Sequence, residues 1–155
     1  GWSVGRDTHR IEGEKFYPHF TWEQAKEMYD SGLVEIQNHS YDMHEGKESD
    51  RYATLPKDGE SSGEYSRAFI EDSEKLKHQI EANVGNEVFA YVYPYGEYTL
   101  QSEQMLKDLG YDVTVSIDNG ISTIRRGDPS SLFALKRINA GVEIPSERLV
   151  EMLGE

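Results

Sequence analysis

Two histidines follow an apolar run near residue 40. His39 and His44 are five positions apart, and residues 33–36 before them are apolar enough for a buried strand. Neutral imidazole is a common ligand of divalent metal ions, so the pair could bind one. On a helix, five residues turn through about 500°, which leaves two side chains about 140° apart. A shared ion therefore requires a loop, placed at the carboxyl end of a strand, where α/β folds commonly hold their chemistry.

The residues between the histidines leave two interpretations open. In a loop that doubles back, Ser40 and Asp42 could orient the imidazoles through hydrogen bonds. Two ligands are too few for a complete site, because protein-bound zinc is usually four-coordinate. The alternative is a polar surface loop that holds two histidines and no metal.

A proline, a tyrosine and a glycine follow another apolar run. Residues 88–92 are strongly β-forming and continuously apolar, which is typical of an interior parallel strand. Pro94 lacks an N–H, and Gly96 permits a tight turn. Such a turn can direct the backbone N–H of Tyr95 into a site, where it would stabilise an oxyanion. A simple turn with aromatic packing explains the same residues.

Arg137 lies in the last predicted strand, residues 133–138. An arginine at the edge of a sheet can keep a catalytic carboxylate ionised through charge-assisted hydrogen bonds. An exposed surface charge is the alternative. Asp118 precedes Asn119 and Gly120, and this combination predicts a turn and not an acidic site residue.

Helices and strands alternate along the chain. A capping box at Thr21 predicts a helix that Gly32 ends, and further helices are expected over residues 64–84, over residues 99–109 and from Ser146. Residues 111–115 complete the set of predicted strands. This alternation predicts an α/β fold with a parallel sheet. Residues 45–62 are rich in charge, glycine and serine, and predict a surface loop.

Composition limits the classes of partner. The chain has 155 residues, enough for one domain, with 16 basic and 29 acidic residues and a formal charge of −13. This charge argues against nucleic acid and anionic lipid, and it is compatible with a neutral or partly cationic glycan. No apolar run approaches the roughly 18 residues of a membrane span. The absence of cysteine excludes a disulfide framework.

Three segments together resemble one family. Residues 39–44 resemble the second motif of the polysaccharide deacetylases (carbohydrate esterase family 4, NodB-homology domain). The histidine spacing is most similar to the branch that acts on poly-β-1,6-N-acetylglucosamine. Residues 89–96 resemble the third motif, a strand ending in Pro-Tyr-Gly, and residues 135–139 are similar to the Leu-x-Arg-Ile segment of the same branch. Many members carry an arginine where Tyr93 stands, so its role cannot be transferred.

The resemblance implies roles for particular residues. His39 and His44 would be ligands of a divalent metal ion, Zn²⁺ first and Co²⁺ or Ni²⁺ as alternatives. Tyr95 would donate its N–H to the oxyanion, and Arg137 would hold a catalytic aspartate. Tyr93, Pro94 and Tyr95 would contact the polysaccharide substrate.

The resemblance also implies a fold and an activity. The family has a distorted (β/α)7 barrel whose first motif, Thr-Phe-Asp-Asp-Gly, supplies a catalytic base and a third metal ligand. This motif does not occur in the sequence. We therefore expect residues 1–155 to be a single, N-terminally truncated domain without the first strands, inactive alone and able to self-associate through an exposed sheet edge. The implied activity is metal-dependent hydrolysis of N-acetyl groups from a β-linked N-acetylglucosamine polysaccharide, in an extracellular or cell-surface location.

Two alternatives to this enzyme remain open from the sequence. The chain could be a non-catalytic glycan-binding or assembly domain that keeps the fold without the chemistry. It could also be an unrelated metallohydrolase, which would need acidic ligands such as Asp42 or Glu45.

Overall fold

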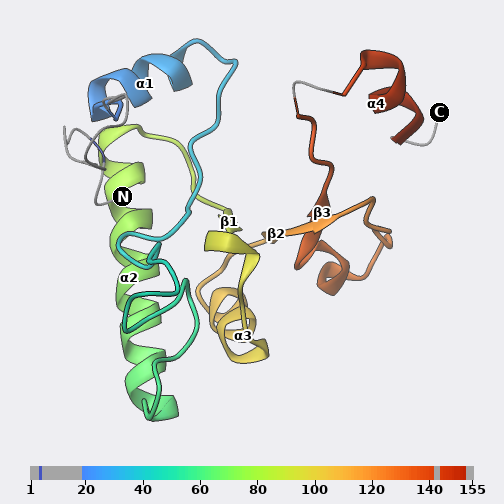
Figure 1. Cartoon of the computed structure of the whole chain (residues 1–155). Coiled ribbons are helices and arrows are strands. Elements are labelled where there is room, and N and C mark those ends of the chain that lie inside the picture. Colours follow the sequence, from blue (N-terminus) through green and yellow to red (C-terminus); the bar gives the residue numbers. More distant parts are fainter. Residues whose placement is uncertain (1–3, 5–18, 142–143, 153–155) are drawn as a thin grey trace.

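The computed structural model describes residue 4, residues 19–141 and residues 144–152 (Figure 1). The predicted truncation concerns the amino-terminal end, where residues 1–3 and 5–18 lie outside the described part. The elements follow one another as α1 (Trp22–Asp30), α2 (Ser62–Asn83), β1 (Ala90–Val92), the 3-10 turn η1 (Pro94–Gly96), α3 (Leu100–Asp108), β2 (Val113–Asn119), the 3-10 turn η2 (Pro129–Leu132), β3 (Leu135–Arg137) and α4 (Ser146–Met152).

The three strands form one parallel sheet in the order β1-β2-β3. Asn38 extends this sheet as a parallel bridge to Tyr91, because its N–H donates to Ala90 O and its carbonyl accepts from the Val92 N–H. The prediction of an α/β fold with a parallel sheet is therefore confirmed. The carboxyl ends of the strands lie at one edge, which also receives the residues that follow Asn38.

The predicted strand over residues 33–36 is wrong. Leu33 is 88% exposed and Val34 is 37% exposed, and neither pairs with a strand. The pairing begins only at Asn38, a polar residue after the apolar run. The apolar residues therefore lead to the sheet without entering it.

The predicted turn at Asp118 is also wrong. Strand β2 continues through Asn119, which pairs with Arg137, and the Gly120 N–H donates to Arg137 O. Strand pairing with β3 therefore overrides the local turn preference of these residues.

Helix boundaries follow their capping residues closely. Thr21, Ser61 and Thr99 each form a capping box at the start of α1, α2 and α3. Gly32 has a φ of 73° just after α1, as expected for a residue that ends a helix. The helix expected from Ser146 is α4; none of its described residues is buried, and Val150 is 45% exposed.

The core lies between α2 and the sheet. Figure 1 shows α2 along one side of the molecule, with the loop after Asn38 against it. The ring centres of Phe69 on α2 and Tyr91 on β1 are 5.9 Å apart, and both side chains are fully buried. This aromatic packing fixes the carboxyl end of β1 relative to α2.

Candidate active site

The two histidines meet at the carboxyl end of the sheet. The ring centres of His39 and His44 are 5.0 Å apart, with the ring planes 64° from parallel. Residues 39–44, here called the histidine loop, therefore double back, as the first of the two interpretations of the spacing predicts. The structure thus excludes rings that face away from each other.

His39 is oriented by the main chain of β1. Its Nδ1 lies 2.7 Å from Val92 O, so a proton on Nδ1 leaves the Nε2 lone pair available for a metal ion. His39 is partly exposed, but burial of part of the side chain lowers its pKa, and the Val92 carbonyl opposes this effect. The neighbouring His44 and Arg137 lower the pKa further. Since neutral imidazole is the form that binds metals, these effects favour a ligand role.

Asn38 anchors the start of the histidine loop. Its buried amide nitrogen donates to Ser73 O at 2.9 Å and to the Tyr111 hydroxyl at 2.6 Å. Its side-chain oxygen accepts the Ser40 N–H at 3.0 Å. Ser40 has a φ of 67°, a left-handed conformation that is costly for a non-glycine residue. The Ser40 hydroxyl in turn accepts the Met43 N–H, so it shapes the loop itself.

The Pro-Tyr-Gly turn lies beside the histidines. The ring centre of Tyr95 is 4.6 Å from that of His44, and the Tyr93 N–H donates to Val115 O, which ties the turn to β2. Tyr95 has a φ of 54°. Within the described residues, no hydrogen bond uses the Tyr95 N–H. This donor is therefore available to a ligand.

Gly96 can only be glycine at this position. Its φ is 73°, and a Cβ there would lie 2.8 Å from the backbone nitrogen of Ile117. The turn consequently packs against β2 at a distance that no side chain permits. This close approach keeps the Tyr95 backbone beside the histidines.

The prediction that the Tyr93 side chain contacts substrate is wrong. Tyr93 is fully buried, its ring stacks on Tyr98 with centres 4.7 Å apart, and burial raises its pKa. Successive side chains of a strand point to opposite faces, so Tyr93 lies on the same side as the buried Tyr91. Pro94 is buried as well, whereas Tyr95 is 40% exposed. Tyr95 is therefore the side chain of this turn that a ligand can reach.

Arg137 ends β3 at the same edge of the sheet and is exposed. Its charge is one of the causes that lower the pKa of His39. It forms no ion pair with any described residue, so the carboxylate that the resemblance implies is not among them.

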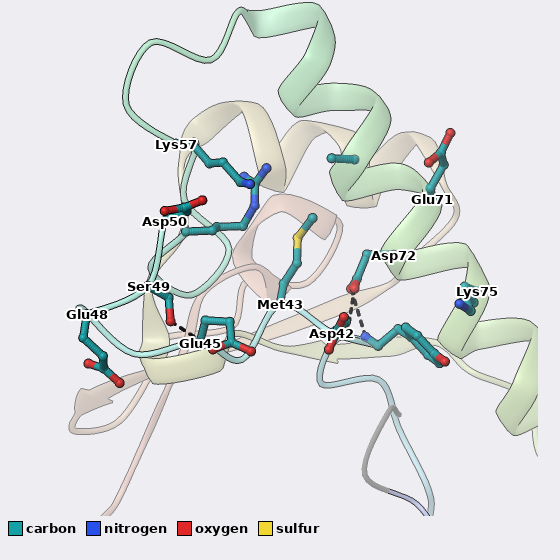
Figure 2. A pocket seen from close by; sticks show the side chains of 13 residues that line it. Asp42, Met43, Glu45, Glu48, Ser49, Asp50, Lys57, Glu71, Asp72 and Lys75 are labelled. Carbon is teal, nitrogen blue, oxygen red and sulfur yellow. Dashed lines mark hydrogen bonds between the residues drawn. The ribbon is translucent and has the colours of Figure 1, made fainter.

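No third protein ligand joins the histidines within the described residues, where no group of three His, Cys, Asp or Glu side chains could hold a metal ion. Asp42 and Glu45 instead line a separate cavity of about 690 Å³ between the loop and α2 (Figure 2). The alternative in which Asp42 or Glu45 completes a metal site with these histidines is therefore wrong for this part of the chain.

Two residues that hold the histidine loop, Asn38 and Asp72, were not predicted from the sequence. A signal for Asp72 exists, because this carboxylate lies on the buried stripe of α2 between Phe69 and Leu76. A lone acidic residue at core spacing indicates a buried hydrogen-bonding role. The signal for Asn38 is weaker: it is an amide directly after an apolar run.

A model of the family "Polysaccharide deacetylase" matches residues 4–114, more than half of the chain. The poly-beta-1,6-N-acetyl-D-glucosamine N-deacetylase of Escherichia coli (strain K12) is 27% identical over 120 residues. That alignment covers 70% of this chain and 18% of the relative, so the chain spans about a fifth of its length.

Three solved structures share the fold. The de-N-acetylase from Aggregatibacter actinomycetemcomitans superposes with a TM-score of 0.73 at 21% identity, covering 97% of this chain and 61% of that one. IcaB from Ammonifex degensii gives 0.67 at 25% identity, with coverage of 90% and 53%. The deacetylase domain of BpsB from Bordetella bronchiseptica gives 0.66 at 24% identity, with coverage of 88% and 57%. From the family match and these folds, we conclude that the chain belongs to the polysaccharide deacetylase family.

Proposed function

We propose that this chain is part of a metal-dependent enzyme that hydrolyses N-acetyl groups of a β-linked N-acetylglucosamine polysaccharide. The observation that carries the proposal is the convergence of His39 and His44 beside the Pro-Tyr-Gly turn. The substrate class rests on the printed activity of the Escherichia coli relative, a poly-beta-1,6-N-acetyl-D-glucosamine N-deacetylase.

The two histidines fit a divalent cation. Two imidazoles that share one tetrahedral ion have ring centres about 5 Å apart, and the observed separation is 5.0 Å. Nitrogen ligands suit Zn²⁺, and also Co²⁺ or Ni²⁺. His39 would bind through Nε2, since its Nδ1 is held by Val92 O. When bound, the cation supplies Lewis-acid polarisation of the acetamide carbonyl.

Tyr95 and Arg137 take separate roles in this proposal. The unused N–H of Tyr95 donates to the oxyanion that forms when water attacks the acetamide, and its exposed ring contacts the sugar. Arg137 holds a catalytic carboxylate in its ionised form, and that carboxylate accepts the proton of the attacking water. Burial is the main cause of the lowered pKa of His39, and the charge of Arg137 adds a smaller contribution in the same direction.

In this proposal, the remaining parts of the site come from residues that these 155 do not include. The family's Thr-Phe-Asp-Asp-Gly motif would supply the third ligand and the base, and the three strands would be later members of a distorted (β/α)7 barrel. The exposed Ile117, Ile121 and Ile124 leave apolar surface that other strands or a second copy would cover. We assign the protein to the cell surface or exterior. None of the described helices has the length and apolar character needed to cross a membrane.

The first test measures free amine released from a poly-β-1,6-N-acetylglucosamine oligomer. We expect little or no release by the 155-residue chain with Zn²⁺, and clear release by the chain extended upstream through the aspartate motif. His39→Ala and His44→Ala should each abolish release, while the exposed His78→Ala should not. Release by the unextended chain would contradict the assignment of the base and third ligand.

A non-catalytic glycan-binding domain is the second candidate, favoured by the lack of a third ligand within the described residues. The coding sequence upstream of Gly1 discriminates the two. An aspartate pair in a Thr-Phe-Asp-Asp-Gly context favours the enzyme, and apolar or basic residues in its place favour the binding domain.

A further inference from the structure

Asp72 is a buried carboxylate on α2 that faces the histidine loop. Its exposure is 9%, and none of the ion pairs among the described residues includes it. Its two oxygens accept the backbone N–H groups of Tyr41 at 2.9 Å and Asp42 at 2.7 Å. Figure 2 shows Asp72 reaching from α2 to the loop at Asp42. A buried charge needs such partners, because desolvation penalises it strongly.

The two N–H groups belong to the middle of the histidine loop. Tyr41 is two residues after His39, and Asp42 is two residues before His44. A single carboxylate that takes both donors therefore fixes the backbone from which both imidazoles extend. The next residue of α2, Ser73, accepts from Asn38 and anchors the beginning of the same loop.

The contact is specific for an ionised carboxylate. Each oxygen of the carboxylate accepts one N–H; burial raises the pKa of Asp72, and the N–H groups of Asp42 and Tyr41 offset only part of this rise. An asparagine at this position would have one oxygen and one NH₂ group, and the NH₂ group would face a backbone N–H donor. One hydrogen bond would be lost, and two donors would be placed opposite each other.

We propose that Asp72 is a positioning residue, which holds the histidine loop in the conformation where His39 and His44 bind one metal ion. The proposal rests on the proposed function in its metal-binding part. Its structural part, that the carboxylate sets the backbone of residues 41 and 42, stands without any metal. Asp72 touches neither the ion nor the substrate, so it acts through the loop alone.

The test compares Asp72→Asn with Glu74→Gln in the 155-residue chain. Both variants remove one negative charge from α2, but Glu74 is exposed. Two quantities are measured by NMR below the melting temperature: amide hydrogen exchange at Tyr41 and Asp42, and the Zn²⁺ dissociation constant from the imidazole signals. Partners that orient metal ligands typically contribute about 10- to 100-fold to metal affinity. We expect Asp72→Asn to raise the dissociation constant at least about tenfold and to accelerate exchange at both amides, with Glu74→Gln unchanged.

Each outcome has a distinct meaning. A lower melting temperature of Asp72→Asn with unchanged zinc affinity and unchanged amide exchange would overturn the proposal, because a merely structural role predicts that result. If the wild-type imidazoles take up no Zn²⁺ but Asp72→Asn accelerates exchange at both amides, the proposed function fails and the positioning role stands. If Asp72→Asn does not fold, Asp72→Glu keeps the charge and moves it by one methylene. Asp72→Glu should then weaken zinc binding and accelerate amide exchange at Tyr41 and Asp42. Wild-type zinc affinity and wild-type exchange in Asp72→Glu would contradict the proposal.

Discussion

The two sides of the candidate site are held in different ways. On the β1 side, the histidine loop is fixed by buried polar side chains, Asn38 and Asp72, and by the aromatic core under α2. On the β3 side, Arg137 is held by strand pairing and by exposed side chains that accept the N–H groups of its neighbours Lys136 and Asn139. The described residues of α4 include none that is buried. The difference teaches that buried side chains order the histidine side of the candidate site, whereas the described contacts of the Arg137 side lie at its surface.

The largest expected loss of stability comes from removing the buried amide of Asn38. Asn38→Ala removes three buried hydrogen bonds, to Ser73 O, to the Tyr111 hydroxyl and from the Ser40 N–H, while the longer bond from the Tyr111 hydroxyl to Ser73 O at 3.3 Å stays. Because each lost buried hydrogen bond costs about 1 kcal/mol or more, we expect a loss of about 3 to 5 kcal/mol of unfolding free energy. Urea denaturation measures it. The control Asn83→Ala removes an exposed side chain of α2 and should change stability by about 0.5 kcal/mol or less. Equal losses in the two variants would contradict the anchoring role.

The next largest effect is expected at Gly96, where close packing adds to backbone strain. Gly96→Ala places an alanine in the left-handed conformation and brings its Cβ too close to the Ile117 backbone. We expect a loss of about 2 to 4 kcal/mol. Gly59 has a similar φ of 75° but open space around its Cβ position, so Gly59→Ala should cost only about 1 to 2 kcal/mol. Calorimetry of both variants gives the difference, and no difference would show that the approach of the turn to β2 is not tight.

Acid should weaken the histidine side through His39. Its pKa is lower in the folded chain than the usual value of 6.5, so the unfolded chain binds more protons between the folded value and 6.5. The contribution of His39 to the unfolding free energy is therefore lost as the pH falls from about 6.5 through the pKa of His39 in the folded chain. Denaturation at pH 7 and pH 5 measures the loss, and His39→Gln should show a smaller one. An equal pH dependence in His39→Gln would contradict the lowered pKa.

The smallest effect is expected on the other side, from Arg137→Gln. Because the side chain is exposed and unpaired among the described residues, stability should change by about 0.5 kcal/mol or less. Loss of the positive charge should raise the pKa of His39, which NMR titration of the ring detects. A large loss of stability would show that the β3 side is better anchored than its contacts indicate.

Local signals in the sequence predicted the helices well, because capping residues such as Thr21 and Ser61 act within one turn. The parallel sheet also followed from the order of the elements, whereas the convergence of His39 and His44 was one of two interpretations that their spacing left open, and the family resemblance favoured it. Predictions from the sequence were wrong where long-range contacts determine the structure. Asn38 enters the sheet, whereas the apolar residues before it do not. Asp118 stays in β2 because the next residue, Asn119, pairs with β3.

The roles of buried polar residues were the hardest to predict from the sequence. The role of Asp72 depends on two N–H groups 30 and 31 positions earlier, which no local pattern reveals. Tyr93 looked like a substrate contact beside Tyr95, but strand alternation directs it into the core. The site could therefore be located from its motifs, while the contacts that hold it required the fold.

The most direct test of the account is a Zn²⁺ titration of the chain followed through the imidazole NMR signals of His39 and His44. We predict that both rings shift together with one ion per chain, and that the exposed His78 does not respond. His39→Ala should remove the response of His44 as well. Independent responses of the two rings, or none, would contradict a shared metal site.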